Sequence, residues 1–148
     1  MRILAIGDEA ANVLYNTKHD DLLEPVDVLL GCGDLPYTYM EHVVTSLKVR
    51  DAFFVHGNHD SDQWLNDGTC LTSPGGWQNV DRHAVRTTDK TLIVAGLQGS
   101  IRYRPHATYQ YSQTEMSVRV MRLVLRFLLN RAVYGRFVDV IIAHSPPQ

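Results

Sequence analysis

The chain has 148 residues, a formal net charge of −2 and 45% hydrophobic residues, values that suit one soluble globular domain over residues 1–148. Near-neutral charge gives no electrostatic indication of nucleic-acid or membrane binding, although a local basic face remains compatible with it. No apolar run approaches the roughly 20 residues that a bilayer-spanning helix needs, and the run after Arg2 is too short for a secretory signal. Cys32 and Cys70 lack a Cys-x-x-Cys spacing, which favours reduced thiols. We therefore expect a cytoplasmic protein.

The first third of the chain alternates apolar runs with helical patterns. Residues 2–7 form a continuous apolar run, which predicts a buried strand, and a short helix or turn is expected at Ala10–Asn16. A second strand is predicted from about Val26, an amphipathic helix at Tyr37–Val49, and a third strand at Ala52–His56. Strands that alternate with helices indicate an α/β fold with a parallel sheet.

The middle of the chain has a weaker pattern. Turn sequences at Asp67-Gly68 and at residues 74–77 predict a surface excursion over residues 61–79. Residues 81–87 and 91–97 predict a two-stranded hairpin. Residues 101–111 are expected to form an aromatic and basic loop.

A long helix is predicted from Ser112 onward, because Ser112 and Glu115 form a capping box. The helix has two faces, of which we expect the apolar one to pack against the protein and the charged one to face solvent. The apolar face carries Met116, Val120, Leu123, Val124, Phe127 and Leu128, and the charged face carries Glu115, Arg119, Arg122 and Arg126.

Four apolar runs end in a side chain that can bind a metal ion. Ile3–Ile6 leads to Gly7-Asp8, Val28–Cys32 leads to Gly33-Asp34, Phe53–His56 leads to Gly57-Asn58-His59-Asp60, and Val138–Ala143 leads to His144. Sites in open α/β sheets form beyond the carboxyl ends of the strands, so parallel strands would gather these side chains at one edge. Oxygen and imidazole ligands suit Mn, Fe or Zn.

In this order, the Gly-Asp, Gly-Asp, Gly-Asn-His-Asp and apolar-run-His motifs resemble the calcineurin-like metallophosphoesterase superfamily across essentially the whole chain. The resemblance implies an α/β/β/α sandwich and hydrolysis of a phosphomonoester or phosphodiester by metal-activated water at a binuclear site. It also implies two divalent metal ions and a phosphorylated small-molecule or nucleotide substrate. In this family two metal ions about 3.5–4 Å apart share a carboxylate.

The resemblance assigns roles to individual residues. Asp34 would bridge the two ions, with Asp8 as a ligand of the first ion and Asn58 and His144 as ligands of the second. The expected catalytic residues are His59, which would contact the phosphoryl oxygens or protonate the leaving oxygen, and Asp60, which would orient the His59 ring. Asn58, His59 and Arg102 are the expected substrate-binding residues.

Three features depart from the family pattern. Ala10 occupies the position of the first-motif histidine, no His-x-His follows His144, and Tyr37 stands where many members carry an acidic or amide residue. These departures support an alternative, a catalytically inactive fragment or non-catalytic binding module on the same fold. They also predict a domain truncated before its last strands, with one metal ion or none and an exposed sheet edge through which two copies could pair.

Overall fold

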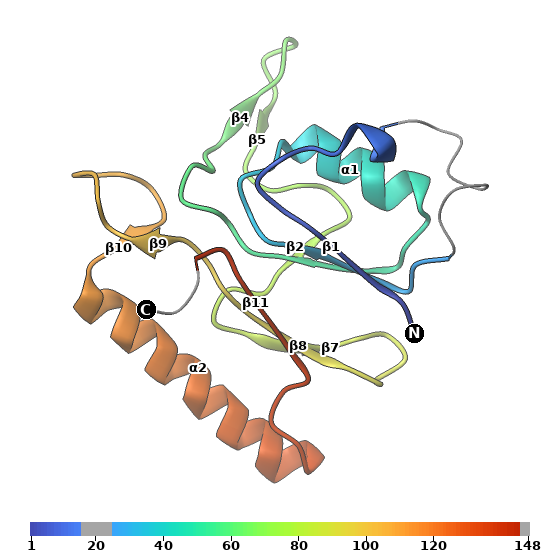
Figure 1. Ribbon diagram of the computed structural model, residues 1–148. Coiled ribbons are helices and arrows are strands. Elements are labelled where there is room, and N and C mark those ends of the chain that lie inside the picture. The colour runs from blue at the N-terminus through green and yellow to red at the C-terminus, as the bar shows by residue number, and fades with distance from the viewer. Residues whose placement is uncertain (16–24, 146–148) are drawn as a thin grey trace.

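The computed structural model describes residues 1–15 and 25–145 and has a mixed α/β fold (Figure 1). Its helices in these ranges are α1 (Tyr37–Ser46) and α2 (Gln113–Tyr134), with a 3₁₀ turn at Asn12–Leu14. The turn lies inside the helix or turn that we predicted for residues 10–16, whose last residue, Asn16, falls outside the described ranges. The predicted helix over 37–49 is confirmed but ends at Ser46, and Lys48 follows it with a left-handed φ of 54°.

The first sheet has the strand order β1-β2-β3-β6, with every pair parallel. The register pairs Ile6 with Gly31 and Gly31 with Phe54, so the first three strands end at the same level. This arrangement confirms the predicted parallel sheet, and it places the polar residues that follow these strands at one edge. The four strands are β1 (Ile3–Ile6), β2 (Val28–Gly31), β3 (Asp51–Phe54) and β6 (Gln78–Asn79).

The second sheet has the order β11-β8-β7. The predicted hairpin is present as β7 (Ala84–Arg86) and β8 (Ile93–Leu97), which pair antiparallel. The strand β11 (Val140–Ala143) runs parallel to β8 and therefore delivers the residue after it, His144, to the same end as β8.

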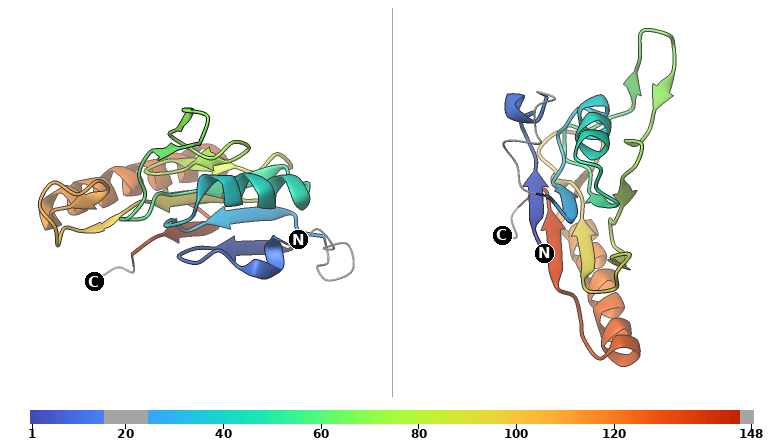
Figure 2. Two further views of the ribbon diagram at one scale, coloured as in Figure 1. Left: turned by 90° about the horizontal axis from the view of Figure 1, so that it is seen from above. Right: turned by 90° about the vertical axis from the view of Figure 1, so that its right-hand side faces the viewer.

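The first sheet is covered on both faces, because its side chains alternate between two cores. Leu29 and Phe54 pack with α1 residues such as Val43 in one cluster. Val28, Leu30 and Phe53 belong to the other cluster, which they share with residues of the second sheet. Figure 2 shows α1 and the second sheet on opposite sides of the first sheet. The central strands β2 and β3 are thus buried from both sides, as their continuous apolar sequences predict. The prediction of a buried first strand is wrong, because β1 lies at the edge of the sheet and Ile3 and Ala5 are exposed.

Two small strand pairs interrupt the long connections. The excursion at residues 61–79 contains the antiparallel pair β4 (Gln63–Trp64) and β5 (Cys70–Leu71). Residues 101–111, predicted as loop throughout, are closed at their base by the parallel pair β9 (Ser100–Ile101) and β10 (Gln110–Tyr111). Two-residue strands carry too little periodic pattern to be found from sequence.

The capping box of α2 is confirmed, since the Ser112 side chain accepts a hydrogen bond from the Glu115 backbone and the Glu115 side chain accepts one from Ser112. The predicted packing face of α2 is confirmed only in part. Its buried residues are Arg119 and Leu123, whereas Val124 and Leu128 are exposed. The helix turns this way because Arg119 pairs with the buried carboxylate of Asp81 at 2.6 Å and stacks on the Tyr111 ring. Met116, Leu123 and Phe127 of the predicted apolar face are buried or half-buried, and Arg122 and Arg126 are exposed as predicted. The helix therefore meets the protein along the boundary between its two predicted faces.

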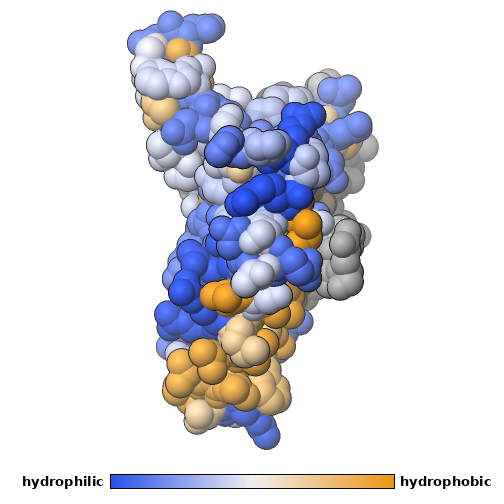
Figure 3. Space-filling view, turned by 90° about the vertical axis from the view of Figure 1, so that its left-hand side faces the viewer, coloured by the Kyte–Doolittle hydropathy of each residue, from blue (hydrophilic) through white to orange (hydrophobic). Residues whose placement is uncertain are grey.

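The outer face of α2 is consequently apolar (Figure 3). The space-filling view shows these side chains gathered at the lower end of the molecule. In the described part of the chain, no helix combines the length and apolarity needed to cross a membrane. The exposed large side chains of α2 are Val118, Val120, Met121, Val124, Leu125, Leu128, Leu129, Val133 and Tyr134.

Candidate metal centre

The corners that follow β1, β2, β3 and β11 meet at one place in the fold. The first two are tied together by backbone hydrogen bonds, in which Asp8 N donates to Gly33 O at 3.1 Å and Cys32 N donates to Ile6 O at 2.8 Å. One ligand atom from each of Asp8, Asp34 and His144 lies within 4.8 Å of the others. The four residues predicted as metal ligands, Asn58 included, are therefore brought together.

His144 has a fixed orientation in this cluster. Its Nδ1 lies 2.9 Å from the carbonyl oxygen of Cys32, and because a carbonyl can only accept, Nδ1 carries the proton. Its Nε2 then faces two further acceptors, Asn58 Oδ1 at 2.8 Å and Asp34 Oδ2 at 3.4 Å. Three electron-rich atoms that face one another repel unless a cation or an added proton lies between them. This donor set therefore fits a divalent metal ion.

The two aspartates are held by unusual backbone conformations. Asp8 and Asp34 have φ values of 61° and 57°, in the left-handed region that residues other than glycine rarely adopt. Asp34 also needs Gly57 beside it, because a Cβ at Gly57 would overlap the Asp34 carboxylate. Strain of this kind concentrates at functional sites, and here it places both carboxylates at the cluster.

His59 lies at the rim of the cluster. Its backbone N–H donates to Asp34 Oδ1 at 2.9 Å, while its ring is exposed and its Nε2 lies 3.2 Å from the Tyr103 hydroxyl. An exposed imidazole beside a cluster of metal ligands can reach a bound molecule, as the prediction for His59 requires.

Asp60 has a different place from the predicted one. Its carboxylate accepts hydrogen bonds from the backbone N–H groups of Gly57 at 2.8 Å and Asp34 at 3.2 Å, and it lies 3.7 Å from Nδ1 of His56. Among the described contacts of Asp60, none reaches the His59 ring. The buried Asp60 carboxylate therefore ties the β3 corner to the β2 corner, and the residue that orients the His59 ring is Tyr103.

The hydrogen bonds of Asp60 set its ionisation. Burial opposes the charged form, but hydrogen bonds from His56, Gly57 and Asp34 outweigh burial and hold the pKa of Asp60 below its ordinary value of 3.8. A carboxyl with a lower pKa in the folded chain than in the unfolded chain stabilises the fold above the unfolded pKa. That stabilisation is lost as the pH falls through the folded pKa.

Asp60→Asn should flatten this pH dependence. The amide keeps an oxygen for the Gly57 and Asp34 N–H groups but cannot ionise, so the variant should be less stable than the wild type at pH 7 and closer to it at about pH 3. Urea unfolding of both proteins at the two pH values measures the difference. An equal gap at both values would contradict the assigned role of the Asp60 charge.

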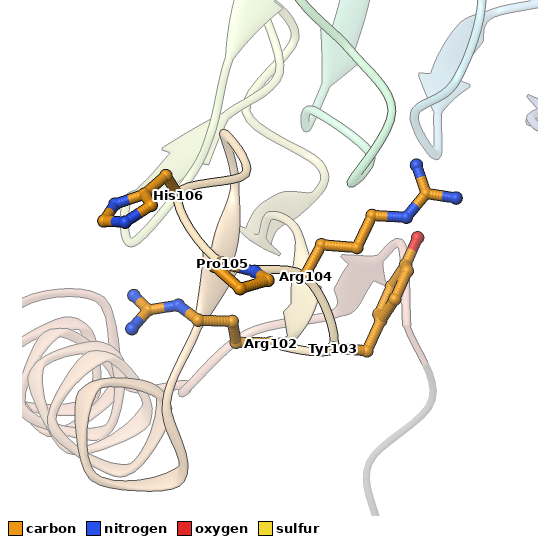
Figure 4. A pocket seen from close by; sticks show the side chains of 5 residues that line it. All are labelled: Arg102, Tyr103, Arg104, Pro105 and His106. Atoms are coloured by element: carbon orange, nitrogen blue, oxygen red, sulfur yellow. The ribbon is translucent and has the colours of Figure 1, made fainter.

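Arg102, predicted to bind substrate, is engaged elsewhere. Its guanidinium pairs with Glu115 at 3.0 Å, and Figure 4 shows it pointing away from Tyr103 and toward α2. The same view shows the guanidinium of Arg104 beside the hydroxyl end of Tyr103. The pocket along this loop has a volume of about 490 Å³ and is lined by residues 102–106. The structure thus pairs Arg102, the predicted substrate-binding arginine, with Glu115, and it places the guanidinium of Arg104 over the Tyr103 ring at 5.6 Å.

Other sequence assignments near the cluster also have clear outcomes. His56 is a buried histidine, stacked on the Tyr109 ring at 4.4 Å. Cys32 and Cys70 are free thiols, and burial together with the Asp8 charge raises the pKa of Cys32. Sequence analysis missed the Cys32 carbonyl as the partner of His144, because any residue can offer a backbone carbonyl. Tyr103 carried a signal, an aromatic residue between two arginines after a glycine-lined corner.

Compared with known proteins, the chain matches no family model, no curated protein and no solved structure.

Proposed function

We propose that this chain is a metal-dependent phosphoesterase domain that hydrolyses a phosphomonoester or phosphodiester of a small molecule or nucleotide. The observation that carries the proposal is the position of His144 Nε2, 2.8 Å from Asn58 Oδ1 and 3.4 Å from Asp34 Oδ2, beside the Asp8 carboxylate. The order of the layers, with α1 outside the first sheet and the second sheet behind it, supports the α/β/β/α sandwich that the motifs imply.

Asp8, Asp34, Asn58 and His144 would hold the ion. Two carboxylates, one amide oxygen and one imidazole suit Mn²⁺, Fe²⁺ or Zn²⁺. A divalent ion at this place would supply Lewis-acid activation of water and of the phosphoryl group. Among the described residues, one group of His, Cys, Asp or Glu side chains could hold a metal ion, and it consists of Asp8, Asp34 and His144. The proposal therefore needs one ion, held by these three residues together with Asn58.

The side chains around the ion site have separate roles, since Asp34 positions His59 and His59 acts on the phosphoester. Asp34 uses one oxygen toward His144 and the other to hold the backbone of His59, so it fixes the distance between the ion site and the His59 ring. In hydrolysis, a water oxygen bonds to phosphorus while the bond from phosphorus to the ester oxygen breaks. The exposed His59 imidazole can donate a hydrogen bond to a phosphoryl oxygen or a proton to the leaving oxygen.

A titration of Mn²⁺ by calorimetry, followed by an assay with a generic aryl phosphate, tests the proposal. We expect saturable binding of Mn²⁺ and hydrolysis that Mn²⁺ stimulates and a chelator removes. Folded protein that binds no Mn²⁺, Fe²⁺ or Zn²⁺ would overturn the proposal.

A metal-binding module without catalysis is the alternative, favoured by the finding of one such cluster among residues 1–15 and 25–145 and by the hydrogen bond that already engages His59 Nε2. It predicts Mn²⁺ binding of normal affinity with no hydrolysis of monoester or diester substrates. The same two measurements therefore separate the two functions.

A further inference from the structure

The backbone around Tyr103 is held by hydrogen bonds, although the Tyr103 side chain is exposed. The backbone N–H groups of Tyr103 and Arg104 both donate to Oε1 of Gln110, at 3.2 and 3.1 Å, and Gln110 is buried. Arg102 N also donates to Tyr111 O at 2.8 Å across the base of the loop. The direction of the Tyr103 side chain is therefore set by the loop backbone.

The Tyr103 hydroxyl lies between two predicted site residues. Nδ2 of Asn58 donates to it at 2.8 Å, and Nε2 of His59 lies 3.2 Å away. An amide NH₂ can only donate, so the hydroxyl oxygen accepts from Asn58. The hydroxyl keeps one proton to donate, and Nε2 of His59 can accept it when the ring carries its own proton on Nδ1.

The same hydroxyl bears on which end of the Asn58 amide faces the cluster. With its NH₂ group held by Tyr103, Asn58 presents its oxygen to His144 at 2.8 Å. An amide turned the other way would present NH₂, which is not a ligand for a cation. The two contacts are linked through the single hydroxyl proton: when it is donated to His59, only hydroxyl lone pairs remain for Asn58, whose NH₂ group then faces Tyr103 and whose oxygen faces the cluster.

We propose that Tyr103 is the positioning residue of this site, whose hydroxyl orients the Asn58 amide for a divalent cation and fixes the tautomer of His59. The part that concerns the cation rests on the proposed function. The part that concerns His59 does not, because the hydrogen bond exists in the metal-free chain.

Tyr103→Phe removes the hydroxyl and keeps the ring. Because the side chain is exposed, we expect the variant to fold normally. Tyr111→Phe is the matched control, since its hydroxyl accepts from Gln98 Nε2 at 2.9 Å outside the cluster. Long-range ¹H–¹⁵N spectra of the metal-free proteins at about pH 8, where an ordinary imidazole is neutral, report which His59 nitrogen carries the proton. We expect Nδ1–H in the wild type and in Tyr111→Phe, and a change toward Nε2–H in Tyr103→Phe only.

Mn²⁺ affinity gives the second readout. Loss of a partner that orients a metal ligand typically weakens metal binding by about 10- to 100-fold, so we expect at least about a tenfold loss in Tyr103→Phe and none in Tyr111→Phe. An unchanged His59 tautomer, or unchanged Mn²⁺ affinity in a chain that binds Mn²⁺, would overturn the inference. If the wild type binds no metal, the proposed function fails, and the His59 spectra alone decide the role of Tyr103.

Discussion

Asp34→Asn should abolish Mn²⁺ binding and lower Mn²⁺-dependent phosphoester hydrolysis by about 10³-fold or more, the largest functional effect we expect from one substitution. Asp34 is the central residue of the cluster, since one carboxylate oxygen faces His144 and the other accepts from the His59 backbone. Its side chain is 13% exposed, so solvent screens its charge little. Asparagine keeps the shape but removes the charge, and it turns an NH₂ group toward one of the two partners.

The measurement is calorimetric titration of Mn²⁺ with the aryl phosphate assay, run on the wild type, on Asp34→Asn and on Asp62→Asn. Asp62 is exposed and close to the site in sequence, so this control removes the same charge without removing a ligand. Asp62→Asn should bind Mn²⁺ within about threefold of the wild type, because surface charges interact weakly through water. Hydrolysis that persists in Asp34→Asn would contradict the assignment of this cluster as the active site.

Gly33→Ala should destabilise the fold by about 4 kcal/mol or more, a loss that point substitutions reach only through strain, cavities or buried unpaired groups. Gly33 has a φ of 94°, and a Cβ there would overlap the Gly57 backbone nitrogen and lie 2.6 Å from its Cα. Neither backbone segment can yield easily, because both corners carry side chains of the cluster. Urea unfolding of the metal-free proteins measures the loss.

Gly68→Ala separates the two causes of this loss, the left-handed backbone conformation and the overlap with the Gly57 backbone. Gly68 has a similar φ of 85°, but no atom lies within 4 Å of the position of its Cβ. It should therefore lose only the roughly 1–2 kcal/mol that a left-handed conformation costs a residue with a Cβ. Equal losses in the two variants would show that the close approach of the Gly33 and Gly57 corners is unimportant.

Sequence reasoning located the cluster because its signal is local. Asp8, Asp34, Asn58 and His144 each follow an apolar run, and the rule that parallel strands end at one edge is enough to bring them together. The roles of Asp60 and Arg102 depended on contacts between loops. Asp60 meets the backbone of the β2 corner and Arg102 meets Glu115, and no pattern along the chain specifies such pairs.

The orientation of α2 was predicted only in part, for a related reason. The pattern of the helix is apolar on one side and basic on the other, and an apolar side ordinarily faces the protein. Here the buried Asp81 carboxylate holds Arg119 from 38 positions away in sequence. A buried charge without a partner is strongly unfavourable, so this ion pair draws Arg119 inward and leaves part of the predicted apolar face, such as Val124 and Leu128, exposed.

At Asp8, a residue that would bind the metal ion has a backbone conformation that lowers the stability of the fold. Its φ of 61° is unfavourable for an aspartate, and its side chain is 80% exposed, so packing of the side chain stabilises the fold little. Glycine at this position would relax the backbone by roughly 1 kcal/mol while removing a ligand. A screen of random variants for heat resistance alone would therefore favour chains that have lost Asp8, and a screen that includes the metal ion would retain it.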